Sequence, residues 1–429
     1  MPSSPKSARS GRTVAPATRA KRPVEHSILT TAVLCTLAVG AVMVYSASSA
    51  ESLLQKSGGD PALYLKRYVF LGLIGLFAMT YLSRSGDALR KVRNLTPLLL
   101  GVSFALTVAV MVPGIGVTIN GATRWLGAGP LQFQPSEMLK VSLVLYAARL
   151  LADRPESVRS IKTLAQPLLI VVGAACLLLL KQPDMGTAMV ICFSIGAMLV
   201  AAGTPMRFLG GLAGGLFVGA GMLAVVEPYR MERLTAFLDP FKDAGDTGFQ
   251  AVQALTAIGS GGLFGVGLGE SVQKIFYLPE AHTDMILAII GEELGVVGMA
   301  GVAVLYGMIG YAGLRTAKAA RDEYSKLLAA GITSLVLCQA TLNFFAVLGM
   351  APLTGVPLPF ISYGSTNLIV LLAGMGLLLN VAATGGIAVS AKPRLRAIDG
   401  GASADDRDRS GRDRGARGPG PGRRRRAAG

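Results

Sequence analysis

The side chains best suited to chemistry in this sequence are a few charged residues at the ends of long apolar segments. Asp284 and Glu280 lie in Leu278-Pro-Glu-Ala-His-Thr-Asp284, immediately before one such segment. A charged side chain inside a bilayer costs about 2.5–3.5 kcal/mol on insertion scales, so it is rare without a function. Asp284 is therefore a candidate functional carboxylate facing a water-filled cavity, and a simple helix cap is the alternative interpretation.

A second group of charges flanks another apolar segment. Arg124 lies in Gly121-Ala-Thr-Arg-Trp-Leu-Gly127, and Glu137 and Lys140 follow in Gln134-Pro-Ser-Glu-Met-Leu-Lys140. Glu137 and Lys140 are three residues apart and therefore share one face of a helix. They can form an ion pair that allows both to be buried, or they can contribute to a binding site, and the two interpretations are compatible.

Two further polar stretches interrupt the apolar sequence. In Gln182-Pro-Asp-Met-Gly-Thr187, Pro183 breaks a helix and Asp184 can cap the next one, an arrangement that needs no function. The stretch 352–364, which includes Ser362, contains too much Pro and Gly for a helix. At membrane depth such backbone must line a cavity or be buried in protein.

The composition indicates a membrane protein. Of the 429 residues, 52% are apolar and only 15% are charged, against about 25% charged in soluble proteins. The net charge of +16 lies mostly in two basic, low-complexity tails, residues 1–25 and 392–429. This distribution excludes a soluble nucleic-acid-binding domain. With only two histidines, a multi-histidine metal site is also excluded, and a Ser-His-Asp triad would require His282.

The apolar segments predict an all-α, polytopic membrane protein with about ten transmembrane helices. They lie near 28–47, 67–82, 95–112, 136–152, 165–181, 185–203, 207–226, 284–314, 326–350 and 364–388. An even number of spans places both tails on one side, and the excess of Lys and Arg in the short loops of that side predicts that both termini are cytoplasmic. The predicted organisation is a membrane domain, residues 26–391, between two disordered tails, 1–25 and 392–429.

The longest segment between spans, residues 227–283, is a predicted large extracytoplasmic loop between the seventh and eighth helices. Its glycine-rich stretch, residues 259–269, could bring backbone N–H groups close to a phosphate. No Lys-Ser/Thr follows and no strand pattern surrounds it, so a flexible or re-entrant hinge fits better than a nucleotide loop. Because every polar cluster lies at the outer ends of the helices, we expect one outward-facing site.

These motifs together resemble the SEDS family (shape, elongation, division and sporulation) of peptidoglycan polymerases, over residues 28–388. The stretches that carry the resemblance are Asn120-Gly-Ala-Thr-Arg-Trp125, Gln134-Pro-Ser-Glu137 with Lys140, Gln182–Thr187, Ala257-Ile-Gly-Ser-Gly-Gly262, Tyr277–Asp284, Gly291-Glu-Glu-Leu-Gly295 and Gly355-Val-Pro-Leu-Pro-Phe-Ile-Ser-Tyr-Gly364. The Tyr277 stretch, Phe249-Gln250 and Val44-Tyr-Ser-Ala-Ser48 are more similar to the division branch of the family than to its elongation branch.

The resemblance implies glycosyl transfer from lipid II, an undecaprenyl-diphosphate-linked disaccharide-pentapeptide, to a growing glycan strand. Asp284 matches the family's essential aspartate, which would accept the proton of the attacking sugar hydroxyl or orient that hydroxyl. The candidates for stabilising the diphosphate are Arg124, Lys140 and Lys274. Glu137 would hold Lys140 in place and His282 would shape its loop, and the predicted substrate-binding set also includes Glu280, Asp184 and Ser362.

The resemblance also implies partners and a location. It requires no cofactor, although a divalent cation, Mg²⁺ or Mn²⁺, could assist the carboxylate. The expected partners are a cognate class B penicillin-binding transpeptidase and other division proteins, with no nucleic acid, at the septum of a bacterial plasma membrane. The alternatives are a flippase for the same lipid, an elongation-type polymerase and a non-catalytic scaffold. A flippase needs polar groups in the inner halves of the spans, which are almost free of charge here.

Overall fold

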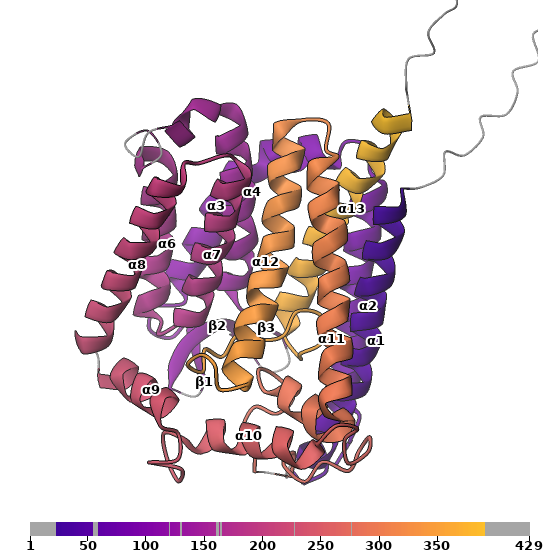
Figure 1. The fold of residues 1–429 in the computed structure, drawn as a ribbon, viewed down its shortest axis with the longest axis vertical. Helices are drawn as coiled ribbons and strands as arrows, with labels where there is room; N and C mark the ends of the chain where they lie inside the picture. Colours follow the sequence, from indigo (N-terminus) through magenta and orange to yellow (C-terminus); the bar gives the residue numbers. More distant parts are fainter. Residues whose placement is uncertain are drawn as a thin grey trace, which may run out of the picture. The chain divides into compact units, whose positions relative to one another are not determined.

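The computed structural model describes residues 23–54, 59–119, 121–128, 131–159, 163, 165–226, 228–275 and 277–390. The predicted tails lie outside these residues, except that α1 begins at Val24. Each predicted span corresponds to one helix of a bundle (Figure 1): α1 (Val24–Leu54), α2 (Leu63–Arg84), α3 (Ala88–Ala109), α4 (Pro135–Asp153), α6 (Ile170–Lys181), α7 (Met185–Ala201), α8 (Met206–Val226), α11 (Ile286–Lys318), α12 (Glu323–Val347) and α13 (Ser365–Ser390).

The chain is a multi-pass membrane protein. Six of the described helices, namely α1, α2, α3, α11, α12 and α13, are long and apolar enough to cross a membrane by length and composition. The helices α6, α7 and α8 contribute shorter apolar segments, and α4 carries Glu137 and Lys140 in its first turns. Large apolar side chains on the outer faces are exposed, Phe77 by 72% and Phe217 by 82%. Such an apolar surface is suited to contact with the acyl chains of a lipid bilayer.

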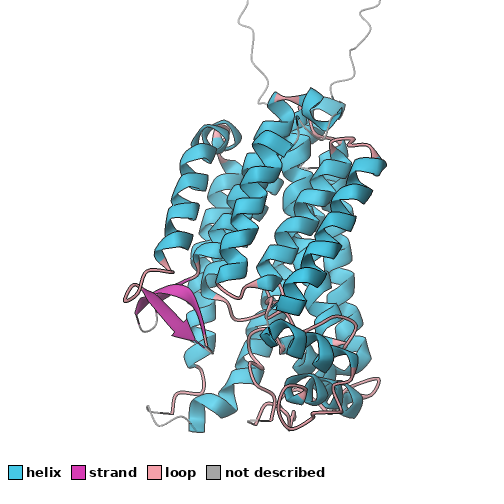
Figure 2. Cartoon of the chain, turned by 90° about the vertical axis from the view of Figure 1, so that its left-hand side faces the viewer, coloured by secondary structure: helices cyan, strands magenta, loops and turns pink. Residues whose placement is uncertain are grey.

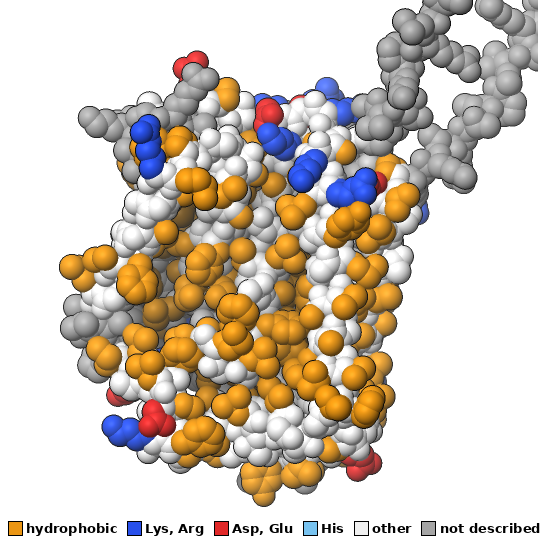
Figure 3. All heavy atoms as spheres, viewed as in Figure 1, with side chains coloured by type: hydrophobic (Ala, Val, Ile, Leu, Met, Phe, Trp, Pro, Cys, Tyr) orange, Lys and Arg blue, Asp and Glu red, His pale blue; other side chains and the backbone are white. Residues whose placement is uncertain are grey.

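Successive helices run in opposite directions, so α1 begins and α13 ends at the same end of the bundle (Figure 1). Lys and Arg side chains gather at that end, above a wide apolar belt (Figure 3). Arg84 closes α2 and Lys318 closes α11 there. The arrangement agrees with the even number of spans predicted from the sequence.

The centre of the bundle is α12, which contacts α4, α7, α11 and α13. Small residues allow close approach: a Cβ added at Gly313 of α11 would lie 2.2 Å from Thr333 Oγ1 of α12. Such contacts are typical of membrane helices, where no hydrophobic effect drives association and tight packing must replace it.

A small sheet, which was not predicted from the sequence, lies at the end of the bundle opposite the termini (Figure 2). It consists of β1 (Gly116–Ile119), β2 (Ala122–Ala128) and β3 (Leu131–Phe133), antiparallel in the order β1-β2-β3. The pairing places Thr118 opposite Thr123, whose hydroxyls are 2.8 Å apart. The sheet holds Arg124 and Trp125 on β2.

The segment 227–283 is more ordered than the predicted loop. It contains two helices, α9 (Pro228–Leu238) and α10 (Phe249–Gly261), at the same end as the sheet (Figure 1). The glycine-rich stretch packs on the beginning of α11, where Val266 N donates to Glu292 O at 2.9 Å and Gly267 N to Glu293 O at 3.1 Å. A Cβ would lie 2.0 Å from Gly291 O at Gly261 and 2.1 Å from Glu293 O at Gly265, so these two glycines serve close backbone packing.

Candidate active site at the end opposite the termini

A cavity of about 340 Å³ opens at the end of the bundle that carries the sheet. Its walls come from the β1–β2 hairpin, from α9 and α10, from the turn before α11 and from the segment before α13. The polar and aromatic side chains that line it are Arg124, Trp125, Gln134, Arg233, Gln250, Glu280, Thr283, Asp284, Tyr363, Thr366 and Asn367. The structure thus brings together three residues of the predicted site, Arg124, Glu280 and Asp284.

Asp284 is held in place through its backbone. It lies in a turn closed by Thr283 N and Met285 N, which donate to Glu280 O at 3.1 and 3.2 Å. The carbonyl of Asp284 accepts a hydrogen bond of 2.7 Å from Asn343 Nδ2 of α12. These bonds leave the carboxylate directed at the cavity. The N-cap residue of α11 is Met285, and the Asp284 side chain accepts no hydrogen bond from a described N–H of that helix. Asp284 is therefore not a simple helix cap.

The surroundings of Asp284 raise its pKa from 3.8 to about 7. The largest cause is the removal of water from the carboxylate, and the negative charge of Glu280 acts in the same direction. A hydrogen bond from Thr283 Oγ1, 3.3 Å from Oδ1, and the positive charge of Arg233 lower the pKa and only partly offset the rise. A carboxylate with a pKa near neutrality is suited to proton transfer at physiological pH.

Arg124 is fixed on the opposite wall by backbone carbonyls. Its Nε donates to Gln182 O at 3.0 Å, and Nη2 donates to Pro183 O. The Gln182 side chain is itself anchored, because Nε2 donates to Thr107 O at 2.7 Å. Asp184 does not line the cavity; it caps α7, as the sequence predicted, by accepting from Thr187 N at 3.2 Å. The polar turn between α6 and α7 therefore positions a cation.

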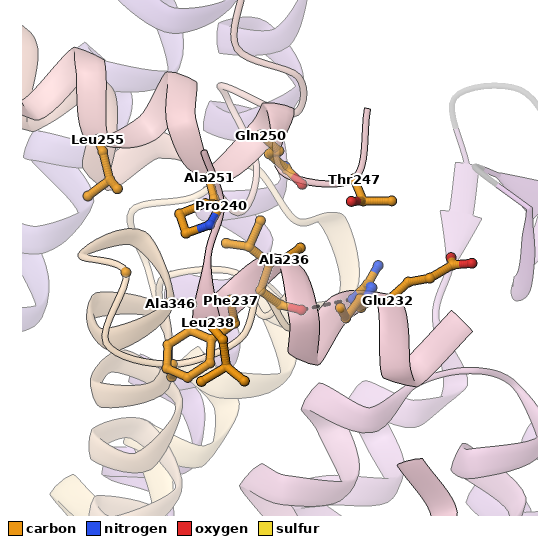
Figure 4. Close-up of a pocket in the computed structure, with 14 residues that line it drawn as sticks. Glu232, Ala236, Phe237, Leu238, Pro240, Thr247, Gln250, Ala251, Leu255 and Ala346 are labelled. Atoms are coloured by element: carbon orange, nitrogen blue, oxygen red, sulfur yellow. Dashed lines mark hydrogen bonds between the residues drawn. The ribbon is translucent and has the colours of Figure 1, made fainter. Parts of the chain in front are cut away.

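Arg233 and Gln250 also line the cavity, and neither was predicted. Arg233 Nη1 donates to Leu353 O at 2.8 Å, and both residues also line a neighbouring cavity of about 440 Å³ (Figure 4). Arg233 lies on α9, whose apolar residues recur every three or four positions between charged ones. This amphipathic pattern could have identified α9 from the sequence, but no local sequence pattern shows that α9 lies close to Asp284.

Glu137 and Lys140 form the buried ion pair that was one of the two interpretations of their spacing. Lys140 Nζ lies 2.9 Å from Glu137 Oε2 and 2.9 Å from Gln339 Oε1 of α12, and the Lys140 side chain is only 1% exposed. Gln339 Nε2 in turn donates to Pro357 O at 2.9 Å. Neither charged residue lines the cavity, so Lys140 supports the cavity wall and does not present a cation to a ligand.

Lys274 also lies apart from the cavity lining. Its ammonium is 2.9 Å from Glu293 Oε1 and 3.2 Å from Ser46 Oγ of α1, in a buried cluster. Glu292 accepts from Ser271 Oγ at 2.5 Å and from Val272 N at 3.0 Å. The two glutamates of α11 thus anchor the chain that leads to Asp284, which is a structural role and differs from the diphosphate contact predicted for Lys274.

His282 and Ser362 are buried behind the cavity wall. The His282 ring lies 4.5 Å from the Tyr64 ring and 5.8 Å from the Tyr363 ring, and His282 O accepts from Tyr363 N at 3.0 Å. These contacts join His282 to α2 and to the segment before α13. Ser362 Oγ accepts from Leu358 N at 2.8 Å and so stabilises a turn.

The segment 352–364 is irregular, and five of its carbonyls accept hydrogen bonds from side chains of four helices, including Leu353 O from Arg233 of α9. Val356 O and Pro357 O accept from Asn343 and Gln339 of α12. Pro359 O accepts from Tyr306 of α11, and Phe360 O from Tyr68 of α2. The segment is both buried and part of the cavity wall, as backbone at membrane depth requires.

A divalent cation is compatible with the cavity. The described residues contain no group of three His, Cys, Asp or Glu side chains that could hold a metal ion alone. Asp284 and Glu280 nevertheless line the same space, and Mg²⁺ is commonly bound by one or two carboxylates together with substrate phosphates and water.

Comparisons with known proteins agree with these observations. The sequence model of one family, described as "Cell cycle protein" and named for FtsW, RodA and SpoVE, matches residues 26–385. The chain is 41% identical over 342 residues to a probable peptidoglycan glycosyltransferase FtsW of Geobacter sp. (strain M18), covering 80% of this chain and 92% of the relative. It is 38% identical over 366 residues to stage V sporulation protein E of Bacillus subtilis, covering 84% and 98%.

Two solved structures are also similar. One, described as "Structural coordination of polymerization and crosslinking by a peptidoglycan synthase complex", matches with a TM-score of 0.67 and 31% identity over 82% of this chain and 96% of that one. The other is the rod shape determining protein RodA of Thermus thermophilus, with a TM-score of 0.59 and 31% identity over 82% and 95%.

Replacing Lys140 should test its structural role. We expect Lys140→Met to lower the free energy of unfolding by about 3–5 kcal/mol, because it leaves the buried Glu137 without its partner. The double variant Glu137→Gln/Lys140→Met should recover much of that loss. Lys181→Met, which removes an exposed lysine at the same end of the bundle, is the control. Thermal unfolding in detergent measures the effect, and unchanged stability of Lys140→Met would contradict it.

The raised pKa of Asp284 predicts a pH-dependent stability. The folded state holds this proton up to about pH 7, whereas the unfolded state releases it near 3.8. Stability therefore falls as pH rises between these values and stays reduced above them. Asp284→Asn removes this cost, so its gain in Tm should be larger at pH 8 than at pH 5. Equal gains at both pH values would show that the carboxylate is not destabilised by its surroundings.

Proposed function

Because this chain belongs to the family of cell cycle proteins that includes FtsW, RodA and SpoVE, we propose that the cavity around Asp284 is where it extends glycan strands. The protein is a peptidoglycan glycosyltransferase, as are its relatives by name. The single observation that carries the assignment of the site is a carboxylate with a pKa of about 7 in a cavity that also presents two arginines.

In the proposed reaction a sugar hydroxyl of one substrate attacks the anomeric carbon of the other. The new C–O bond forms as the bond between that carbon and the diphosphate oxygen breaks. The hydroxyl proton passes to the Asp284 carboxylate, and the polyprenyl diphosphate leaves with the bonding electron pair. Because the pKa of Asp284 is about 7, the carboxylate is partly ionised at neutral pH and basic enough to accept the proton.

Arg124 and Arg233 are the proposed diphosphate contacts. Both line the cavity, and both are positioned in advance by hydrogen bonds to backbone carbonyls. Cations that are already oriented stabilise developing negative charge without a reorganisation cost. In this proposal Arg233 replaces Lys140 and Lys274, the candidates from the sequence, as a contact of the diphosphate. When bound, a divalent cation would be held by Asp284 and Glu280 and would supply further positive charge to the leaving group.

The proposed substrate is lipid II, supplied from the outer leaflet, with both termini in the cytoplasm. The gathering of Lys and Arg at the end that carries the termini supports this orientation (Figure 3). The buried charges support polymerisation over flipping. Glu137 lies in the first turn of α4, Asp184 caps α7 and Glu292 lies in the second turn of α11, all at the cavity end, whereas a flippase needs a polar path to the other end.

The proposed setting is septal wall synthesis during division, in a plasma membrane and together with a class B penicillin-binding transpeptidase. Curated relatives named FtsW are 38–43% identical to this chain, which supports a role in division. A similar solved chain belongs to a complex that coordinates polymerisation with crosslinking, which supports a crosslinking partner for this chain.

Asp284→Asn should abolish glycan polymer made from labelled lipid II by the purified protein, because the base is lost while size and polarity are kept. The control is Glu270→Gln, which removes an exposed carboxylate from the same segment. The only tryptophan of the sequence, Trp125, lines the cavity, so its fluorescence reports substrate binding separately. We expect Asp284→Asn to keep the fluorescence change. Polymer formation at the wild-type rate would refute the assignment of the base.

The pH dependence of polymerisation should report the same carboxylate. The base acts in its ionised form, so the rate should rise with pH and reach half its maximum near pH 7. Arg233→Gln removes a positive charge that lowers the pKa of Asp284, so this half-maximum should move to higher pH. Lys242→Gln, an equal loss of charge at an exposed position, should leave the midpoint in place. A profile with no change in rate between pH 6 and 8 would contradict proton transfer to Asp284.

A further inference from the structure

A third cavity lies toward the other end of the bundle, the end at which α1 begins and α13 ends. It has a volume of about 550 Å³ and lies between α3, α4 and the beginning of α6. Its floor and sides are apolar, with Leu100, Phe104, Leu150, Ile170 and Val171 among them. We call this cavity the basic-end groove. The helices α3, α4 and α6 belong to the membrane bundle, and Ile170 is 62% exposed. The groove therefore faces the acyl chains of the lipid bilayer.

The head of the basic-end groove carries charge. Arg149 and Arg154 line it together with one carboxylate, that of Asp153. Both oxygens of Asp153 are already engaged, Oδ1 by Arg93 and Oδ2 by Arg149 Nε at 3.7 Å. Arg93, Arg149 and Arg154 therefore leave an excess of positive charge where the groove meets the end of α4. Arg154 directly follows α4 and is exposed, and no ion pair of its side chain is found among the described residues.

The apolar part of the basic-end groove has room for a chain of methylene groups. A Cβ placed at Gly101, one of its lining residues, would meet no atom within 4 Å. One wall is fixed by Tyr146, whose hydroxyl donates to Pro167 O at 2.8 Å. A small soluble anion would leave this apolar surface uncovered, and an uncharged lipid would leave the positive charge that Asp153 does not balance without a counter-charge. A ligand with a phosphate head and an acyl chain satisfies both.

We propose that the basic-end groove binds one anionic phospholipid of the leaflet next to the termini. The phosphate lies against Arg154 and Arg149, and an acyl chain follows the groove between α3, α4 and α6. Basic pockets between membrane helices on the cytoplasmic side are typical sites for acidic headgroups. The site is separate from the cavity around Asp284, and it requires no assumption about the reaction there.

The test is native mass spectrometry of the full-length protein with added phosphatidylglycerol or phosphatidylcholine. Phosphatidylglycerol should remain bound in preference to phosphatidylcholine. Arg154→Gln should reduce its retention about fivefold, and Arg149→Gln/Arg154→Gln should reduce it further. Arg321→Gln, which removes an exposed arginine at the same end but outside the groove, should have no effect. If loss of the Arg149 contacts affects folding, lipid retention by the single variant Arg154→Gln is sufficient to test the proposal.

A second pair of variants tests the acyl chain independently of charge. Gly101→Leu should fill the groove and displace the lipid, whereas Gly173→Leu, at a position that is equally open but does not line the groove, should not. Millimolar inorganic phosphate should fail to displace the lipid, because it lacks the chain. Equal retention of both lipids by the wild-type protein, unchanged retention in Arg154→Gln, or displacement by phosphate alone would each overturn the proposal.

Discussion

The candidate site depends on two amide side chains of the central helix. Gln339 and Asn343 lie four residues apart on one face of α12 and each bridges two other parts of the chain. Gln339 accepts from Lys140 of α4 and donates to Pro357 O, and Asn343 donates to both Asp284 O and Val356 O, because an amide group has two N–H donors and an acceptor oxygen. One turn of α12 therefore fixes α4, the irregular segment before α13 and the turn that carries Asp284 relative to each other.

This arrangement separates two kinds of buried charge. Lys140 and Lys274 are each neutralised by a glutamate at 2.9 Å, so they stabilise the walls and are not available to a ligand. Asp284 has no ion pair among the described contacts, and its pKa rises to about 7. The other buried carboxylates of this region are held by an ion pair, as in Glu137 and Glu293, or by hydrogen bonds, as in Asp184 and Glu292. Perturbed titration confined to a cavity is typical of a functional group.

The sequence predicted what local patterns determine. Ten helices follow from apolar length alone, the Asp184 cap from a Pro-Asp pair, and the contact between Glu137 and Lys140 from their spacing. The remaining features depend on partners far along the chain. Strands of three to seven residues are too short for a periodic signal, and the ion pair of Lys274 with Glu293 arises only when the glycine-rich stretch packs on α11. Arg233 reaches the site because α9 lies across the cavity.

The direction of the helices explains why an anionic substrate suits this end of the bundle. Because successive helices alternate, α4 and α13 both begin at the cavity, and Gln134, Thr366 and Asn367 at their first turns line it. Gln134 N donates to Thr366 Oγ1 at 2.9 Å, which joins the two helix beginnings. Helix N-termini carry partial positive charge. They add to the positive charge of Arg124 and Arg233 around the cavity, whereas Asp284, the proposed base, is partly protonated at neutral pH because its pKa is about 7. A diphosphate can therefore enter without strong repulsion from the Asp284 carboxylate.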